Sequence, residues 1–228
     1  MDASVATKPV LVIRSGIAER LWEAARLEFS QRGYHGARVQ GIARRAGCNV
    51  ALLYRHWSSK KALYLELLRS VWLGISGEMV ALMEQGRGAP SVVAAYLDAH
   101  MRDPKGAQLI IREVLEGSPF LSQLVAADPT LVEPLRRAAH VLSGGDGPET
   151  SRPGVDGSVA VLCIGGLAAL VASAHEATRA FLPTPLSAEE WRSQVHDLLL
   201  YGVGAPAAGS GDHPPPIEPT PFQPRPST

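Results

Sequence analysis

The chain has 228 residues, of which 46% are hydrophobic and 19% are charged, and its formal net charge is zero. This composition is typical of a globular protein of one or two domains, and the zero net charge argues against a uniformly basic nucleic-acid binder. The charge is nevertheless segregated, because eleven Lys/Arg and only four Asp/Glu lie between Arg14 and Arg69. The asymmetry predicts an anion-facing N-terminal module on a neutral or acidic body.

Cysteine content and apolar runs bear on the cellular compartment. Cys48 and Cys163 stand far apart and have no metal-ligand spacing, so we expect no zinc site, no disulfide and no cofactor. The early apolar run at 10–13 is too short for a secretory signal. The longest run, 159–174, falls short of the roughly 18 residues that a membrane span needs. We therefore expect a cytoplasmic protein with no membrane partner.

The chain begins with a tail and two helices. Residues 1–13 are predicted to be a flexible tail. Apolar residues then recur about every 3.6 positions over 15–32, which predicts an amphipathic helix that ends at Gly33. A second, shorter helix is predicted over 39–46.

A tight turn and a third helix follow. Gly47 ends the second helix, and Asn49 supplies a side-chain cap for a helix that begins at Val50. Ser58-Ser59 ends that helix and caps a fourth, predicted over 60–85. Two short helices joined by a glycine-containing turn are typical of the helix-turn-helix unit, whose second helix enters the DNA major groove.

The rest of the chain is also helical in pattern, and we find no alternating strand pattern, so the predicted fold class is all-α. Its prolines fit the first turns of new helices. Residues 144–157 are predicted to form a loop. The segment 204–228 holds eight prolines and is predicted to be a disordered tail. The further helices are predicted near 91–102, 105–117, 119–126, 129–143, 156–181 and 187–203.

The two sides of the third helix differ in chemistry. At about 100° per residue, four side chains gather on the inner side and are expected to pack into the module: Val50, Leu53, Tyr54 and Trp57. The outward side is small, apolar and cationic, with Ala51, Leu52 and Arg55, and it suits phosphates and thymine methyl groups. The flanking groups expected to contact phosphate are Arg38, Arg44 and Arg45 on the second helix, Tyr54 and His56 on the third, and Lys60 at the start of the fourth.

A set of spaced residues occurs within 14–68: Phe29, Gly33, Tyr34, Val39, Ile42, Ala43, Ala46, Gly47, Cys48, Asn49, Leu53, Tyr54, His56, Trp57, Ser59, Lys60, Ala62 and Leu63. This set resembles the N-terminal domain of TetR-type transcriptional regulators. The resemblance implies a helix-turn-helix DNA-binding domain at 14–68 and an effector-binding and dimerisation domain at 69–203.

By the same resemblance, Gln40, Ala51, Leu52 and Arg55 lie at or near base edges. Leu52 stands where the family usually has Thr or Ser, so packing against a thymine methyl group is the expected replacement. Several other residues complete the predicted DNA-binding set, in which Val50 occupies a frequently polar position: Arg38, Arg44, Arg45, Asn49, Val50, Tyr54, His56 and Lys60.

The body holds no catalytic constellation in its sequence, and we predict that the protein is not an enzyme. The family has an apolar effector cavity among the middle helices. Candidate cavity residues were chosen because they are aromatic, soft or hydrogen-bonding at helical spacing: Trp72, Met79, Met83, Tyr96, His100, Met101, Phe120 and His140. Arg112 and Glu116, spaced i, i+4, are expected to form a surface pair.

The helix at 156–181 is apolar almost all round, which predicts burial on both sides. The resemblance implies a homodimer through this helix and the one at 187–203; a core helix of a monomer is the alternative. The predicted function is a ligand-responsive regulator, a repressor released from a palindromic operator by a small lipophilic effector. Two alternatives remain, a DNA-binding protein that responds to no ligand and an enzyme that carries a helix-turn-helix.

Overall fold

A computed structural model of the chain describes residues 16–143, 156–179 and 187–201, and all regular structure within these ranges is helical. This confirms the all-α fold class. The elements are α1 (Ile17–Gly36), α2 (Val39–Arg45), α3 (Val50–His56), α4 (Lys60–Glu84), α5 (Ala89–Arg102), α6 (Pro104–Leu115), α7 (Pro119–Ala127), the short 3₁₀ helix η1 (Pro129–Val132), α8 (Glu133–Leu142), α9 (Gly157–Arg179) and α10 (Ala188–Tyr201).

The helices follow the predicted order with small shifts at their ends. Gly33 interrupts α1 with φ 64° and ψ −179°, so the main helix stops where expected, but one further turn continues to Gly36. The segment predicted as one helix over 129–143 is η1 followed by α8. The predicted tails, and nearly all of the loop predicted at 144–157, lie outside the described residues.

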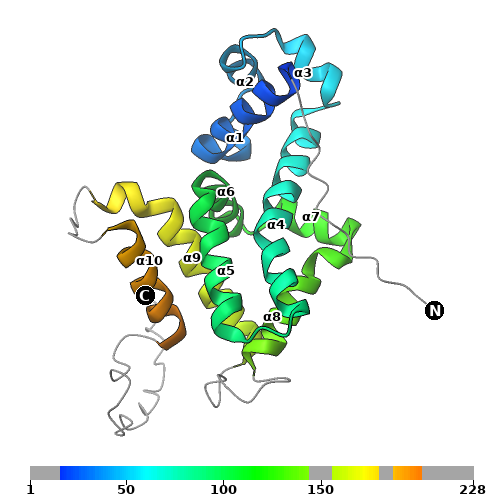
Figure 1. Cartoon of the computed structure of the whole chain (residues 1–228). Coiled ribbons are helices and arrows are strands. Elements are labelled where there is room, and N and C mark those ends of the chain that lie inside the picture. Colours follow the sequence, from blue (N-terminus) through cyan, green and yellow to red (C-terminus); the bar gives the residue numbers. More distant parts are fainter. Residues whose placement is uncertain (1–15, 144–155, 180–186, 202–228) are drawn as a thin grey trace, which may run out of the picture.

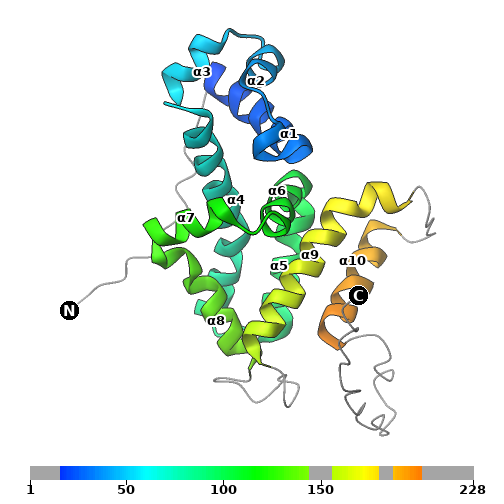
Figure 2. The ribbon, with the colours of Figure 1, turned by 180° about the vertical axis from the view of Figure 1, so that it is seen from behind.

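Helices α1–α3 form a module at one end of the molecule, and α4 runs from this module down the length of the body (Figure 1). In the body α4 packs against α5 and α8, while α6 and α8 pack against α9. Helices α9 and α10 lie along one side of the body, as the view from behind also shows (Figure 2). Within the described ranges, no helix combines the length and hydropathy that crossing a membrane requires.

The largest apolar core crosses from the module into the body. It joins Leu21 and Phe29 of α1 and Leu53 of α3 to Leu68 of α4 and Leu109 of α6, all almost fully buried. The domain boundary predicted between residues 68 and 69 falls inside α4 and inside this core. The module is therefore packed directly onto the body through the side chains of this shared core.

Candidate nucleic-acid interface and internal cavity

The turn between α2 and α3 is held by backbone geometry. Gly47 has φ 68°, and no atom lies near the position of an added Cβ, so glycine is needed there for its conformation alone. The Cys48 N–H donates to the Ala43 carbonyl at 3.0 Å, which closes the end of α2. The Asn49 side chain accepts from the Leu52 N–H at 3.0 Å and caps α3. The predicted turn and cap are both present.

The inner side of α3 is fixed by two buried residues. Leu53 is fully buried and Trp57 nearly so. The Trp57 indole stacks on Trp22 of α1 with ring centroids 6.3 Å apart, and its Nε1 donates to Glu66 of α4 at 2.7 Å. These contacts hold α3 against α1 and α4, so the orientation of its outer side depends on both helices.

The expectation that the Tyr54 ring packs into the module is wrong. Tyr54 is 49% exposed. Because α3 has only seven residues, Leu53 and Trp57 fill its narrow inner side, and Tyr54 lies about 100° away from Leu53 around the helix. The ring and hydroxyl therefore belong to the outer surface of the module.

Most of the predicted DNA-binding side chains are also exposed. The exposed members are Arg38, Gln40, Arg44, Arg45, Asn49, Ala51, Tyr54, Arg55 and His56, while Val50, Leu52 and Lys60 are partly buried. No carboxylate of the described residues lies within 4.0 Å of the guanidinium groups of Arg38, Arg44 or Arg55. Uncompensated cations beside a small apolar patch provide the charge and shape that phosphates and base edges require.

Arg45 differs from the other arginines because it faces Glu28, a residue that sequence reasoning missed. Glu28 is only 3% exposed and lies 3.6 Å from Arg45 Nη2 and 3.4 Å from Arg32 Nε. Its Oε1 also accepts from the Arg38 backbone N–H at 3.4 Å. A buried carboxylate needs such partners, so Glu28 ties α1 to the start and end of α2.

Lys60 serves an internal contact in this structure. Its Nζ donates to the Ala37 carbonyl at 2.7 Å and lies 4.6 Å from the centroid of the Tyr34 ring. Desolvation lowers the pKa of the Lys60 amine. The ammonium therefore joins the start of α4 to the segment between α1 and α2, and its contact with phosphate stays a prediction.

Glu113 of α6 organises a second buried site, which we call the junction: Tyr64, Glu113, Phe120 and Leu121. Glu113 is 1% exposed, and its Oε2 accepts from the Tyr64 hydroxyl of α4 at 3.0 Å. Its Oε1 accepts from the Phe120 and Leu121 N–H groups in the first turn of α7, at 2.6 and 3.0 Å. Burial, and after it the charge of Glu113, raise the pKa of Tyr64, so the phenol keeps its proton.

Arg112, next to Glu113, connects the body to the module. Arg112 was expected to pair with Glu116 on the surface, but its hydrogen bonds go to the module instead. Its Nε donates to the Ser30 carbonyl at 2.8 Å, and its Nη2 donates to the Gln31 carbonyl at 3.0 Å. These carbonyls lie at the end of the main α1 helix, where backbone acceptors lack helical partners. At the other end of α6, Asp103 pairs with Arg26 of α1 and caps α6 through the Gly106 N–H.

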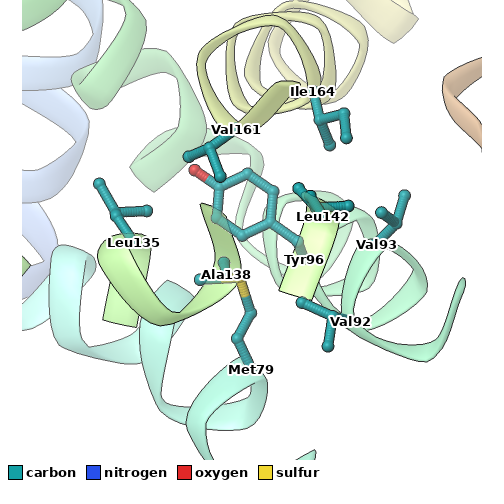
Figure 3. A pocket seen from close by; sticks show the side chains of 9 residues that line it. All are labelled: Met79, Val92, Val93, Tyr96, Leu135, Ala138, Leu142, Val161 and Ile164. Atoms are coloured by element: carbon teal, nitrogen blue, oxygen red, sulfur yellow. The ribbon is translucent and has the colours of Figure 1, made fainter. Parts of the chain in front are cut away.

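A cavity lies at the opposite end of α4 from the module, among α4, α5, α8 and α9. Its lining is aliphatic except for one ring (Figure 3), and consists of Met79, Val92, Val93, Tyr96, Leu135, Ala138, Leu142, Val161 and Ile164. The cavity is partly open to the surface, and its volume is about 20 Å³, roughly the space of one water molecule. Figure 3 shows the Tyr96 ring in the middle of these side chains, with Val161 beside its hydroxyl.

The structure brings only some of the predicted effector residues together. Met79 and Tyr96 line the cavity, Met83 packs beside it, and His100 is buried against the Tyr96 ring. The other four candidates lie elsewhere: Trp72 donates to the Leu131 carbonyl, Met101 packs near α9 and α10, Phe120 belongs to the junction, and His140 is exposed on α8. The aliphatic lining was not predicted from the sequence, because Val, Leu, Ile and Ala at helical spacing are equally typical of an ordinary hydrophobic core.

Helix α9 has one side on the core and one side uncovered. Ala168, Ala169 and Ala172 are buried within this chain. On the uncovered side, Leu162 is 73% exposed and Leu170 is 51% exposed. Residues 180–181 and 202–203 of the predicted dimer helices lie outside the described ranges.

Comparison with known proteins places the module in a family. The sequence profile of the bacterial regulatory proteins of the tetR family matches residues 21–67. Over 91 residues the chain is 40% identical to the HTH-type transcriptional activator FasR of Mycolicibacterium smegmatis, covering 38% of this chain and 42% of FasR. Over 106 residues it is 31% identical to the HTH-type transcriptional regulator RutR of Escherichia coli, covering 44% of this chain and 49% of RutR. The matches thus span less than half of either relative.

The fold as a whole also has known counterparts. The transcriptional regulator FadR of Bacillus subtilis, solved in complex with stearoyl-CoA, superposes with a TM-score of 0.56 at 17% identity, over 82% of this chain and 99% of FadR. Identity this low shows a shared fold: an N-terminal helix-turn-helix and a helical body. Together with the sequence matches, it means that the N-terminal module is of the type found in the bacterial regulatory proteins of the tetR family, and that it is joined to a body with the fold of FadR.

Proposed function

We propose that the protein is a homodimeric, ligand-responsive repressor that binds a palindromic operator. The observation that carries this proposal is the outer surface of α3 and its flanks, where Arg38, Arg44 and Arg55 are exposed and have no carboxylate partner among the described residues. In this proposal α3 enters the major groove, with Ala51, Leu52 and Arg55 at base edges. Arg38, Arg44 and His56 contact phosphates on either side.

A second copy of the chain is the proposed partner of α9 and α10. Leu162 and Leu170 of α9 and Leu198 of α10 are exposed apolar side chains, and the two helices lie along one side of the body (Figure 1). Burying such side chains against a symmetric copy removes their apolar area from water. A two-fold dimer presents two α3 helices to one face of DNA, about 34–36 Å apart or a multiple of that spacing, and this spacing calls for an inverted repeat.

The proposed effector is a small, mainly apolar molecule that enters the cavity beside Met79 and Tyr96. Met79 and the junction residue Tyr64 lie on the same continuous helix, α4, and Lys60 begins it. A ligand that enlarges the cavity displaces α4, and the shift reaches the module through the shared core and through Trp57–Glu66. FadR, which has a similar fold, was solved with stearoyl-CoA, and this supports an effector with an apolar part.

The test is selection of bound sequences from random duplex DNA by the full chain, followed by affinity measurements on the selected site. We expect an inverted repeat and a dissociation constant that rises steeply with salt. Arg55→Glu should weaken binding at least about tenfold, since it replaces an attractive charge at the groove with a repulsive one. Arg136→Glu, an exposed change on α8 far from the module, is the matched control and should change affinity less than about twofold.

Failure to enrich any sequence, or equal losses in the two variants, would contradict the proposal. Leu162→Asp should convert the dimer to a monomer in sedimentation measurements. If the variant keeps the mass of a dimer, α9 is not part of the interface. FasR is named an activator, so the direction of regulation needs its own test with a reporter gene placed downstream of the selected site. If the protein is a repressor, expression of the reporter is higher in cells that lack the protein.

A further inference from the structure

One ring nitrogen of His100 in α5 is buried without a partner. His100 is fully buried, and its Nδ1 lies 2.8 Å from the Tyr96 carbonyl oxygen. Since a carbonyl oxygen can only accept, Nδ1 carries the hydrogen, and in the neutral ring Nε2 is left as an acceptor. Within the described residues no group donates to Nε2. A buried acceptor in this state is costly to the fold and favourable for a ligand that donates.

The neutral state of the ring follows from its surroundings. Desolvation lowers the pKa of His100, and this effect outweighs the hydrogen bond to the Tyr96 carbonyl and the charge of Asp103, which act in the opposite direction. Near neutral pH, Nε2 therefore offers a lone pair and no proton. The chemistry it recognises is a hydroxyl or another neutral N–H or O–H donor.

The Tyr96 side chain contacts the His100 ring and also lines the cavity. The two ring centroids are 4.5 Å apart. Burial raises the pKa of Tyr96 to about 12, and no described residue forms a hydrogen bond with its hydroxyl. The hydroxyl faces Gly165 of α9, where an added Cβ would lie 2.9 Å from it. The ring is thus held by packing alone, and moving it breaks no hydrogen bond.

A ligand buried in this cavity requires a change in the lining when it is larger than a water molecule, because the volume available is only about 20 Å³. Tyr96 is the largest side chain of the lining and the one whose ring contacts His100. Its displacement would enlarge the cavity toward the His100 ring. No lining residue is cationic, so a carboxylate brought to the same place would meet a bare acceptor and no counter-charge.

We propose that Tyr96 is a gate and that His100 Nε2, exposed when the gate moves, receives the hydroxyl of an uncharged lipophilic effector. The proposal rests on the proposed effector function and adds the class of ligand: an alcohol or phenol, in preference to a carboxylic acid. His100 determines specificity for the donor, and Tyr96 controls access and the space available.

The experiment measures calorimetric affinities of the full chain for octanol, octane and octanoate at neutral pH. We expect octanol to bind at least about tenfold more tightly than octanoate, because burial of an unpaired charge is strongly unfavourable. His100→Phe keeps the ring and removes the acceptor. It should weaken the affinity for octanol about three- to tenfold, which is the effect of one lost hydrogen bond. The affinity for octane should change less than about twofold.

Two further variants separate the roles. His100→Gln supplies a carbonyl acceptor and should recover part of the octanol affinity, which a merely structural role for His100 would not produce. Tyr96→Ala removes the ring and leaves its space open to the ligand, so the affinities for octanol and for octane should both increase. Each variant is first shown to fold by its melting transition and by wild-type affinity for the selected DNA.

Several outcomes would overturn the proposal: octanoate binding as tightly as octanol, equal losses of octanol and octane in His100→Phe, or no binding of any probe to wild type and to Tyr96→Ala. Failure of the proposed regulatory function is seen separately. If octanol binds with the expected preferences but leaves the affinity for DNA unchanged, the ligand class stands and the effector role of the cavity falls.

Discussion

Two buried polar side chains, Glu113 and His100, stand in opposite situations within one body. Both oxygens of Glu113 accept hydrogen bonds, from the Tyr64 hydroxyl and from two N–H groups of α7. His100 uses one nitrogen in a bond to Tyr96 and leaves the other without a partner among the described residues. A polar group with all its partners stabilises a fold, whereas one that lacks a partner costs stability unless something else supplies it.

The comparison extends to the surroundings of each residue. Around Glu113 the rings of Phe29, Tyr34, Tyr64 and Phe120 pack at centroid distances of 4.4 to 5.1 Å, and the module is attached there. The neighbour of His100, Tyr96, instead lines a cavity, and its hydroxyl has no hydrogen-bond partner among the described residues. We infer that the junction transmits movement as a rigid unit, while the cavity end of α4 is the part that can change.

The largest expected effect is loss of the junction carboxylate. Glu113→Leu leaves the Tyr64 hydroxyl and the Phe120 and Leu121 N–H groups buried without acceptors, so the free energy of unfolding should fall by about 3–5 kcal/mol. Urea titration followed by tryptophan fluorescence measures it. Glu113→Gln keeps an acceptor for the two N–H groups and should cost clearly less. A loss below about 1 kcal/mol for Glu113→Leu would mean that the junction does not hold the fold together.

A matched pair of hydroxyl deletions tests the contrast directly. Tyr64→Phe removes a buried donor from Glu113 and should lower the free energy of unfolding by about 1–3 kcal/mol. Tyr96→Phe removes a hydroxyl that forms no hydrogen bond with any described residue, so the free energy of unfolding should change by less than about 0.5 kcal/mol. The same urea titration serves both variants. Equal costs at the two positions would abolish the distinction between the two regions.

Arg112→Met tests whether the junction reaches the module. Arg112 donates to two carbonyls at the end of the main α1 helix and is partly exposed, so its loss should cost about 1 kcal/mol. Hydrogen exchange should become faster in α1 before it does in α8. Arg137→Met, which removes an exposed ion pair with Glu84 at the other end of α4, is the control and should cost less than about 0.5 kcal/mol. Equal effects would show that Arg112 does not anchor the module.

Local chemistry explains what could be predicted from the sequence. Asn49 and Ser59 cap α3 and α4 through residues three positions away, and the prolines at 104, 119 and 129 begin new helices, so these features need no tertiary information. Glu113 could not be predicted, because its partner Tyr64 lies 49 residues away in the sequence. The cavity lining could not be distinguished from ordinary core, since what defines it is incomplete packing and not residue type.

The smallest expected effect is a pH dependence of the free energy of unfolding that comes from the buried ring of His100. Desolvation lowers the pKa of His100 in the folded chain below the ordinary value of 6.5. As the pH falls below about 6.5, the unfolded chain binds a proton that the folded chain does not, so stability is lost between that value and the lower folded pKa. The loss at pH 6 should be at most about 0.8 kcal/mol.

His100→Gln removes this titration, so its unfolding free energy should fall less than that of wild type between pH 7 and pH 6. His35→Gln, at an exposed histidine of the module, should leave the wild-type dependence in place. If the His100→Gln and wild-type curves run parallel over this range, the buried ring is not held in its neutral state, and Nε2 loses its status as a free acceptor. The contrast with Glu113 would then rest on the cavity and on Tyr96 alone.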